Sequence, residues 1–152
     1  MLACVPVVWM TQHDSKKMSS EQELAIEQAI IDVQEKMQQA AQQGDVDALY
    51  EYVLEMDNGV IIEDGRIRWT RQEALNSTKQ GLQGLKDLSY AYSQKRITVI
   101  SPTMALWVGE GMSSATLQDG RQISVPFAES ILFVEKDGQW KVFHAHRSVP
   151  NR

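Results

Sequence analysis

The stretch LWVGEGMSSATLQDGRQISVPFAESILFVEKDGQWKVFHAHRS, residues 106–148, decides the fold class, because it consists of strand-forming runs separated by tight turns. Asp-Gly pairs stand at 119–120 and 137–138, each between two such runs. Asp-Gly is a preferred pair for a two-residue hairpin turn, since both central residues need positive φ. Further turns are indicated by Asp-Gly at 64–65 and by Ser101-Pro102-Thr103. We therefore expect a small early hairpin and, from about residue 88 to 149, four long antiparallel strands.

Before these strands the sequence predicts three helices. Ser20 and Glu23 fit a capping box, in which each side chain satisfies an unpaired amide of the first turn. Apolar residues then recur at three- and four-residue steps up to Gly44, which is the pattern of a helix with one buried stripe. Asp45 predicts a shorter helix to about residue 53. A second capping box at 70–73 predicts a third helix that ends before the long strands.

Helices that precede an antiparallel meander indicate an α+β fold, with the helices on one face of a curved sheet. The alternating strand and helix order of a nucleotide-binding fold is missing from the sequence, and so is a glycine-rich phosphate loop. We expect one domain over residues 20–150, preceded by an N-terminal tail over residues 1–19.

The composition fits a single globular domain. The chain has 152 residues, of which 43% are hydrophobic and 23% charged, close to the average for such domains. Its net charge of −5 argues against a protein that gains affinity by neutralising phosphates, so neither nucleic acid nor an anionic membrane is an expected partner. The single cysteine, Cys4, excludes an internal disulfide and a zinc site built from several thiolates.

Residues 2–10, LACVPVVWM, form an apolar run that is too short to span a bilayer, which needs about 20 residues. The basic segment that opens a signal peptide does not precede it. We therefore expect a cytoplasmic protein. The order Leu2-Ala3-Cys4 resembles the end of a lipoprotein signal, so a periplasmic or exported protein is the alternative if the true start lies upstream of Met1.

The hairpin turns also predict which side chains share a face of the sheet. A two-residue turn at 137–138 places Glu129 opposite His146, and one at 119–120 places Glu110 opposite Glu129. The turn at 102–103 adds Lys95 beside Glu110. Opposed side chains lie about 4.5–5.5 Å apart at Cβ, so the sequence predicts a polar row across one face. This row is bordered by Leu106, Val108, Met112, Phe127, Ile131, Phe133, Val142 and His144.

Two interpretations of the polar row stay open. If the helices cover it, burial and like charge push one glutamate toward neutrality while the other stays ionised beside His146, an arrangement that acid–base catalysis uses. Alternatively, Lys95 and His146 balance the two glutamates in a purely structural network. His144 and His146 at period two would also suit a metal with Glu129 as third ligand, but we expect neither a metal nor another cofactor.

The other face of the predicted sheet is flat and largely apolar. It would carry Gly109, Gly111, Ala128, Ser130 and Ala145, with Trp107, Leu132, Val134 and Phe143 at one end and Arg147 at the other. Such a surface is unfavourable in water, so we expect a two-fold homodimer or a larger oligomer through this face. The alternative cover is the apolar segment 2–10. Pro126 inside a strand indicates an edge or a bulge, and one bulge reverses the faces of all later residues.

The closing segment GQWKVFHAHRSVP, residues 138–150, together with the order of helices and strands, resembles the NTF2-like superfamily. The likeness is to its SnoaL-like and ketosteroid-isomerase-like members and to the association domain of calcium/calmodulin-dependent kinase II. The D-G-x-W, H-x-H and R-S pattern of that domain is matched by Asp137-Gly138, Trp140, His144, His146, Arg147 and Ser148. The resemblance implies a cone-shaped, cystatin-like sheet wrapped on a long helix, an open pocket between them, and dimers formed through the sheet.

The resemblance also implies functional residues. In the association domain, pocket arginines take up small carboxylates; Arg147 matches one of them, whereas Ile131 stands where another arginine is found. Ketosteroid isomerases use an acidic base, with a tyrosine and a second acid as oxyanion donors. Those groups would come here from Asp57, Glu110 or Glu129 and from Tyr50 or Tyr90. Trp69 is a candidate wall of the pocket mouth or, equally, a hydrophobic staple for the third helix.

We therefore expect an NTF2-like dimer whose pocket binds a small, partly apolar organic molecule. The candidate catalytic residues are Glu110, Glu129 and His146, and the candidate ligand-binding residues are His144, Arg147, Trp69, Tyr50 and Lys95. One alternative is a cofactor-independent isomerase, dehydratase or cyclase that uses a Glu/His acid–base pair. Another is an oligomerisation module like the association domain.

Overall fold

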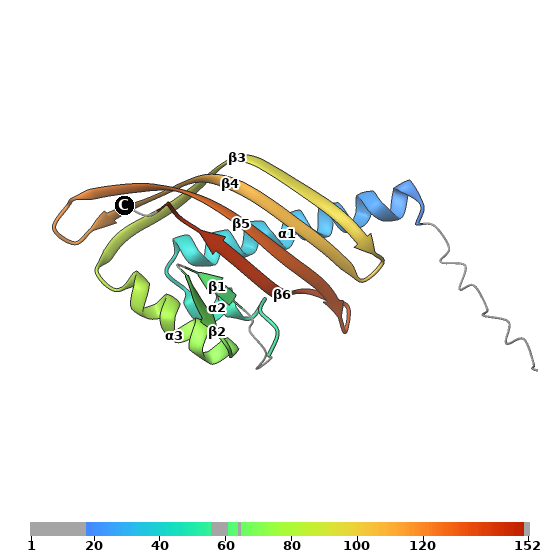
Figure 1. Ribbon diagram of the computed structural model, residues 1–152, viewed down its shortest axis with the longest axis horizontal. Coiled ribbons are helices and arrows are strands. Elements are labelled where there is room, and N and C mark those ends of the chain that lie inside the picture. The colour runs from blue at the N-terminus through green and yellow to red at the C-terminus, as the bar shows by residue number, and fades with distance from the viewer. Residues whose placement is uncertain (1–17, 56–60, 64, 151–152) are drawn as a thin grey trace, which may run out of the picture.

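The computed structural model describes residues 18–55, 61–63 and 65–150. The elements are, in order, α1 (Ser20–Gln42), α2 (Val46–Tyr50), β1 (Ile61–Glu63), β2 (Arg66–Arg68), α3 (Arg71–Leu82), β3 (Leu85–Ser101), β4 (Met104–Leu117), β5 (Gln122–Lys136) and β6 (Gln139–Ser148). The strands form a six-stranded sheet in the order β2-β1-β6-β5-β4-β3, antiparallel except for the β1–β6 pair. Helix α1 lies along one face of the curved sheet, with α2 and α3 near β1 and β2 (Figure 1). The predicted α+β class is confirmed.

Helix α1 begins one residue earlier than the sequence pattern predicted. Ser19, not Ser20, is the N-cap: its hydroxyl accepts from the Gln22 amide at 3.2 Å, and Gln22 Oε1 accepts from the Ser19 amide at 3.0 Å. The capping box is therefore present, with glutamine in the role expected of Glu23. After the helix, Gly44 adopts a φ of +71°, a conformation that favours glycine.

Asp45 and Thr70 cap α2 and α3 as predicted. Each side chain accepts a backbone amide of the first turn of its helix at 3.0 Å. Helix α2 ends at Tyr50, earlier than the predicted residue 53. The second capping box is incomplete, because the Glu73 carboxylate accepts from the amide of Trp69 instead of that of Thr70.

The hydrophobic core lies between the helices and the sheet face turned toward them, which we call the inner face. Buried Trp107, Phe133 and Val142 of this face pack with Ile30 of α1 and Tyr50 of α2. Burial of apolar surface contributes about 25 cal/mol per Å², so this layer is the main source of stability. The opposite side of the sheet is the outer face.

The β4–β5 hairpin departs from the predicted register by one residue. Its loop spans residues 118–120, because Leu117 already pairs with Arg121, and Gly120 adopts a φ of +86°. A three-residue loop with glycine in the left-handed region is a common alternative to the two-residue turn. Glu110 consequently lies opposite Ala128 on the outer face, and the predicted pairing of Glu110 with Glu129 is wrong.

The β5–β6 hairpin has the predicted two-residue turn at 137–138, but its register changes further along. Phe133 pairs with Val142 as expected, and a bulge at Phe143 then shifts every later pair by one residue. His146 therefore lies opposite Ser130 on the outer face. Arg147 takes the place expected for His146, opposite Glu129 on the inner face.

The β3–β4 hairpin also begins as predicted, with Ser101 opposite Met104 across the turn at 102–103. An irregularity between Val99 and Ser101 then shifts the pairing, so that Lys95 lies opposite Gly109 instead of Glu110. Lys95 nevertheless stays on the inner face, where its Nζ lies 5.8 Å from the centre of the Trp107 ring.

These register changes also revise the predicted outer face. Ala128, Ser130, Leu132 and Val134 of β5 alternate outward as predicted, whereas Trp107, Gly109, Gly111, Ala145 and Arg147 belong to the inner face. Phe143 stays on the outer face as predicted, and the residues that replace the others there are Leu106, Val108, Glu110, Met112, His144 and His146. Pro126 lies where β6 has already ended, so β5 has only β4 as a neighbour there, and no shift occurs at it.

Candidate functional site

A row of charged residues crosses the inner face from β1 to β3. Glu63 lies beside Arg147, Arg147 opposite Glu129, Glu129 opposite Gly109, and Gly109 opposite Lys95. Charges of alternating sign thus follow one another, with glycine as the single gap. We call the centre of this row, together with the side chains that contact it, the inner-face cluster: Gln34, Tyr90, Tyr92, Phe127, Glu129 and Arg147.

The Glu129 carboxylate is held by two neutral donors. The Tyr92 hydroxyl donates a very short hydrogen bond to Glu129 Oε1, and Gln34 Nε2 donates to the same oxygen at 3.3 Å. Gln34 Nε2 also donates to the Tyr92 hydroxyl at 2.9 Å. Gln34 stands in the middle of α1 with only 6% of its surface exposed, so the helix fixes the position of the carboxylate from above the sheet.

Tyr92 reaches Glu129 because Gly109 leaves space on the strand between them. A Cβ at position 109 would lie 2.9 Å from both Cδ1 and Cε1 of the Tyr92 ring, closer than real Cβ atoms approach. The ring passes over this gap and packs edge-on against Trp107 and Phe127, with centroids 5.6 and 5.3 Å away.

Burial, followed by the negative charge of Glu129 and the hydrogen bond to it, raises the pKa of Tyr92 well above its usual range. Removing the phenolic proton would place two negative charges on adjacent oxygens in a half-buried site, which is unfavourable. Tyr92 therefore remains protonated at neutral pH and acts as a hydrogen-bond donor to the carboxylate.

Arg147 is the cationic member of the cluster and lies against aromatic rings. Its guanidinium carbon is 4.4 Å from the Phe127 ring centre and 4.8 Å from that of Tyr90, a cation–π geometry. One weak hydrogen bond, 3.4 Å long, runs from Nη1 to the Tyr90 hydroxyl. Among the described residues, no carboxylate oxygen lies within 4.0 Å of this guanidinium, although Glu129 and Glu63 flank it in the sheet.

Three buried polar atoms, two in the cluster and one on the adjacent Trp107, have no hydrogen-bond partner within the described part of the chain. They are the Arg147 Nε–H and Trp107 Nε1–H donors and the Gln34 Oε1 acceptor. Buried polar atoms in native proteins are nearly always paired with protein, water or ligand. The unpaired groups are thus two donors, on Arg147 and Trp107, and one acceptor, on Gln34.

Tyr50 belongs to a separate junction between α2 and α3. Its hydroxyl and that of Thr78 are 2.8 Å apart, and its carbonyl accepts from the Arg71 guanidinium at 2.5 Å. Burial raises the pKa of Tyr50 to about 12, although the hydrogen bond with Thr78 acts in the opposite direction. These contacts tie the helices together and give Tyr50 no contact with Glu129.

The structure thus separates the residues that the sequence grouped together. Glu129, Lys95 and Arg147 share the inner face, whereas Glu110, His144 and His146 lie on the outer face. The physical reasons are the three-residue loop at 118–120 and the bulge at Phe143. Trp69 lies at the start of α3 with 56% of its surface exposed, and Asp57 falls outside the described residues.

Sequence reasoning missed Gln34 and Tyr92. One signal for Gln34 was available: it stands four residues after Ile30 and three before Met37, so a polar side chain interrupts the apolar stripe of α1. For Tyr92 the alternation Tyr90-x-Tyr92 indicated one shared face, but its contact with Glu129 depends on Gly109 and on the true register.

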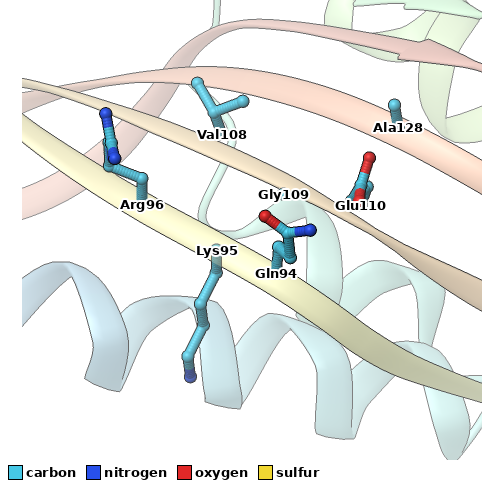
Figure 2. Close-up of a pocket in the computed structure, with 7 residues that line it drawn as sticks. All are labelled: Gln94, Lys95, Arg96, Val108, Gly109, Glu110 and Ala128. Atoms are coloured by element: carbon cyan, nitrogen blue, oxygen red, sulfur yellow. The ribbon is translucent and has the colours of Figure 1, made fainter.

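A hollow of about 480 Å³ lies on the outer face, away from the cluster (Figure 2). It is lined by Gln94, Lys95, Arg96, Val108, Gly109, Glu110 and Ala128. Figure 2 shows the Lys95 side chain directed toward the helix, while Arg96, Val108 and Glu110 point to the other side.

Residues 18–55, 61–63 and 65–150 contain neither a cluster of metal-ligating side chains nor a membrane-spanning helix. No group of three His, Cys, Asp or Glu side chains in them is placed to hold a metal ion. In particular, His144 and His146 are on the opposite face from Glu129, the third ligand considered. None of the helices in the same residues has the length and apolar character needed to cross a bilayer.

Comparison with known proteins gives one match to a family. The sequence profile of the SnoaL-like domain matches residues 30–152. No curated protein matches the chain.

Solved structures with the same fold are numerous and distant in sequence. A protein described as a putative scytalone dehydratase from Novosphingobium aromaticivorans superimposes with a TM-score of 0.78 at 16% identity, covering 88% of this chain and 89% of that one. A putative calcium/calmodulin-dependent protein kinase II association domain from Xanthomonas campestris gives 0.69 at 17% identity, covering 89% and 91%. An NTF2-like superfamily protein from Salmonella enterica gives 0.76 at 13% identity, covering 86% and 94%. At these identities the likeness establishes the fold alone.

Proposed function

This chain belongs to the SnoaL-like domain family of the NTF2-like superfamily, and from that premise we propose that its inner-face cluster binds a small, partly apolar organic molecule through Arg147. The observation that carries the proposal is the Arg147 guanidinium, which lies on two aromatic rings with no carboxylate within 4.0 Å among the described residues. A guanidinium that is partly removed from water without a counter-ion is unfavourable, and an anionic ligand would relieve that cost.

The neighbours of Arg147 support an apolar body on this ligand. Phe127 is buried, and Tyr90 lies edge-on to it with a centroid separation of 5.9 Å. An aromatic ligand beside these rings would exchange water for the ring contacts that such sites favour. The carboxylate of Glu129, next to Arg147 in the sheet, would disfavour a dianion, so we expect a single negative charge on the ligand.

Benzoate, a small aromatic monoanion, is the probe that tests this proposal, with neutral benzamide as its isosteric comparison. We expect benzoate to raise the melting temperature of the wild type, because a ligand that binds only the folded state stabilises it. The shift should disappear in Arg147→Met and persist in Arg121→Met, an exposed arginine on the β4–β5 hairpin. Equal shifts for benzoate and benzamide, or an unchanged benzoate shift in Arg147→Met, would disprove the assigned role of Arg147.

A second candidate function is acid–base catalysis at Glu129, favoured by the two neutral donors that position its carboxylate. Glu129 would take a proton from a carbon next to a carbonyl. The C–H electrons would form a C=C bond as the C=O π electrons move to the oxygen, and Arg147 would stabilise the resulting enolate. Proton removal of this kind is the first step of both isomerisation and dehydration reactions. The Glu/His acid–base pair predicted from the sequence is not formed, since His146 lies on the outer face.

Deuterium exchange into 2-tetralone, a small ketone with removable C–H protons, tests this candidate by proton NMR in D₂O. Catalysed exchange should be lost in Glu129→Gln and kept in Glu110→Gln, whose carboxylate lies on the outer face. If the protein binds benzoate but deuterium exchange is no faster with the protein than in buffer alone, catalysis is disproved and binding remains the proposed function.

The outer face is the proposed contact between two copies of the chain. Val108, Met112 and Phe143 expose 46%, 44% and 37% of their surfaces there, which is unfavourable for a lone protomer. Sedimentation equilibrium at micromolar concentration should therefore detect a dimer. A sample that contains only monomer would disprove the proposed dimer. Association without any benzoate response would instead favour the oligomerisation module.

A further inference from the structure

Two opposite charges stand beside the outer-face hollow without an ion-pair partner. Arg96 of β3 lies opposite Val108, and Glu110 lies two residues further along β4, so the two charged residues are diagonal neighbours. Within residues 18–55, 61–63 and 65–150, neither side chain takes part in an ion pair. Both are exposed and directed away from the helix (Figure 2).

The surroundings of this pair are small, apolar or neutral: Ala128, Val108 and Gln94, the last of which lies opposite Glu110. The short side chain of Ala128 leaves the hollow of about 480 Å³ between taller side chains, and exposed Val108 lines it. In a lone protomer these charges are exposed to water, so their electrostatic interactions with the surface around them are weak. Once a partner displaces water, the same charges interact more strongly and select the orientation of that partner.

The charge pattern indicates which partner fits. A single cation and a single anion near one point make a patch without net charge, so a strongly acidic or basic protein has no advantage there. A second copy of the chain, turned about a two-fold axis through this patch, would offer a glutamate to each arginine and an arginine to each glutamate. A two-fold interface is self-complementary in just this way.

We propose that the two copies associate through the outer face with two reciprocal ion pairs, Arg96 of each protomer with Glu110 of the partner subunit. This inference rests on the dimer proposed above and adds the axis position and the residues that fix its register. Arg96 and Glu110 both line the hollow at Ala128, so the facing copy would lie over this hollow when the two ion pairs form. An apolar side chain of the facing copy would then fill it.

Charge reversal tests the pairing by sedimentation equilibrium. Arg96→Glu and Glu110→Arg should each weaken self-association by at least about tenfold, because each places two pairs of like charges in contact. An equimolar mixture of the two single variants should form a heterodimer, since every contact then joins opposite charges. The double variant Arg96→Glu/Glu110→Arg should self-associate again for the same reason, which separates pairing from misfolding.

The control is Arg121→Glu, which reverses an exposed arginine on the hairpin and should leave association unchanged. If the wild type dimerises and the single reversals do not weaken the dimer, or if the mixture fails to restore it, the pairing is wrong while the dimer stands. If the wild type is a monomer, the dimer itself is wrong, and the pairing falls with it.

Discussion

Replacing Tyr92 by phenylalanine should destabilise the protein through Glu129. The substitution keeps the ring against Trp107 and Phe127 and removes only the hydroxyl that donates to the carboxylate and accepts from Gln34. A hydrogen bond to a charged group contributes about 1.5–3 kcal/mol. Tyr92 is only partly exposed, so we expect a loss of about 2 kcal/mol in the free energy of unfolding, or about 4–8 °C in melting temperature for a chain of this size.

Urea denaturation followed by far-ultraviolet circular dichroism measures this loss directly. The matched control is Tyr52→Phe, whose hydroxyl has no hydrogen bond among the described residues and whose ring lies 5.9 Å from Lys141 Nζ. The urea midpoint should fall in Tyr92→Phe with an unchanged m value, since the folded state keeps its compactness. A loss no greater than that of Tyr52→Phe would refute the reasoning.

A double-mutant cycle with Glu129→Gln then tests the mechanism. If the Tyr92 hydroxyl acts through the negative charge of Glu129, its removal should cost about 1 kcal/mol less once that charge is gone. Additive losses would mean that the hydroxyl stabilises the fold by some other contact.

Two further predictions concern backbone space and alkaline pH. Gly111→Ala should destabilise the protein more than Gly109→Ala in urea unfolding, because a Cβ at 111 would lie 2.1 Å from a backbone oxygen of β3. A Cβ at 109 would meet the Tyr92 ring, which can rotate away at a cost of about 1–3 kcal/mol. The reverse order of the two losses would contradict this account. Because the folded pKa of Tyr50 is about 12 against an ordinary 10.0, the unfolded chain loses this proton first as pH rises. Tyr50 should therefore lower the free energy of unfolding by about 3 kcal/mol between pH 10 and pH 12, in addition to the loss from Tyr92, whose pKa is also raised. Tyr50→Phe should remove that part of the pH dependence, and an identical alkaline decline in the variant would rule out Tyr50 as its source.

The secondary structure could be predicted because its signals are local. The caps Asp45 and Thr70, the apolar stripe of α1 and the turns at 102–103 and 137–138 all behave as their residue types predict. The pairing of β1 with β6 was not foreseen, since a parallel contact between segments more than eighty residues apart leaves no turn between them to count from.

The candidate site was predicted only in part, because it depends on register. Glu129 and Lys95 were expected on one face and lie there, but one extra loop residue sent Glu110 to the other side. One bulge residue exchanged His146 for Arg147. Side chains alternate with a period of two, so each single-residue error reversed the face of everything beyond it.

By itself, the amino-acid sequence determined the α+β class, the helix caps, the hairpin positions and the inward direction of β5, since each follows from residue types within a few positions of one another. Only the tertiary structure decided which side chains meet. Gln34 descends on Glu129 because α1 packs across the sheet, Tyr92 reaches it because Gly109 leaves the space, and Arg147 stands beside it because of the bulge at Phe143. These are contacts between distant segments, and their geometry is set by packing and register, which local propensity does not encode.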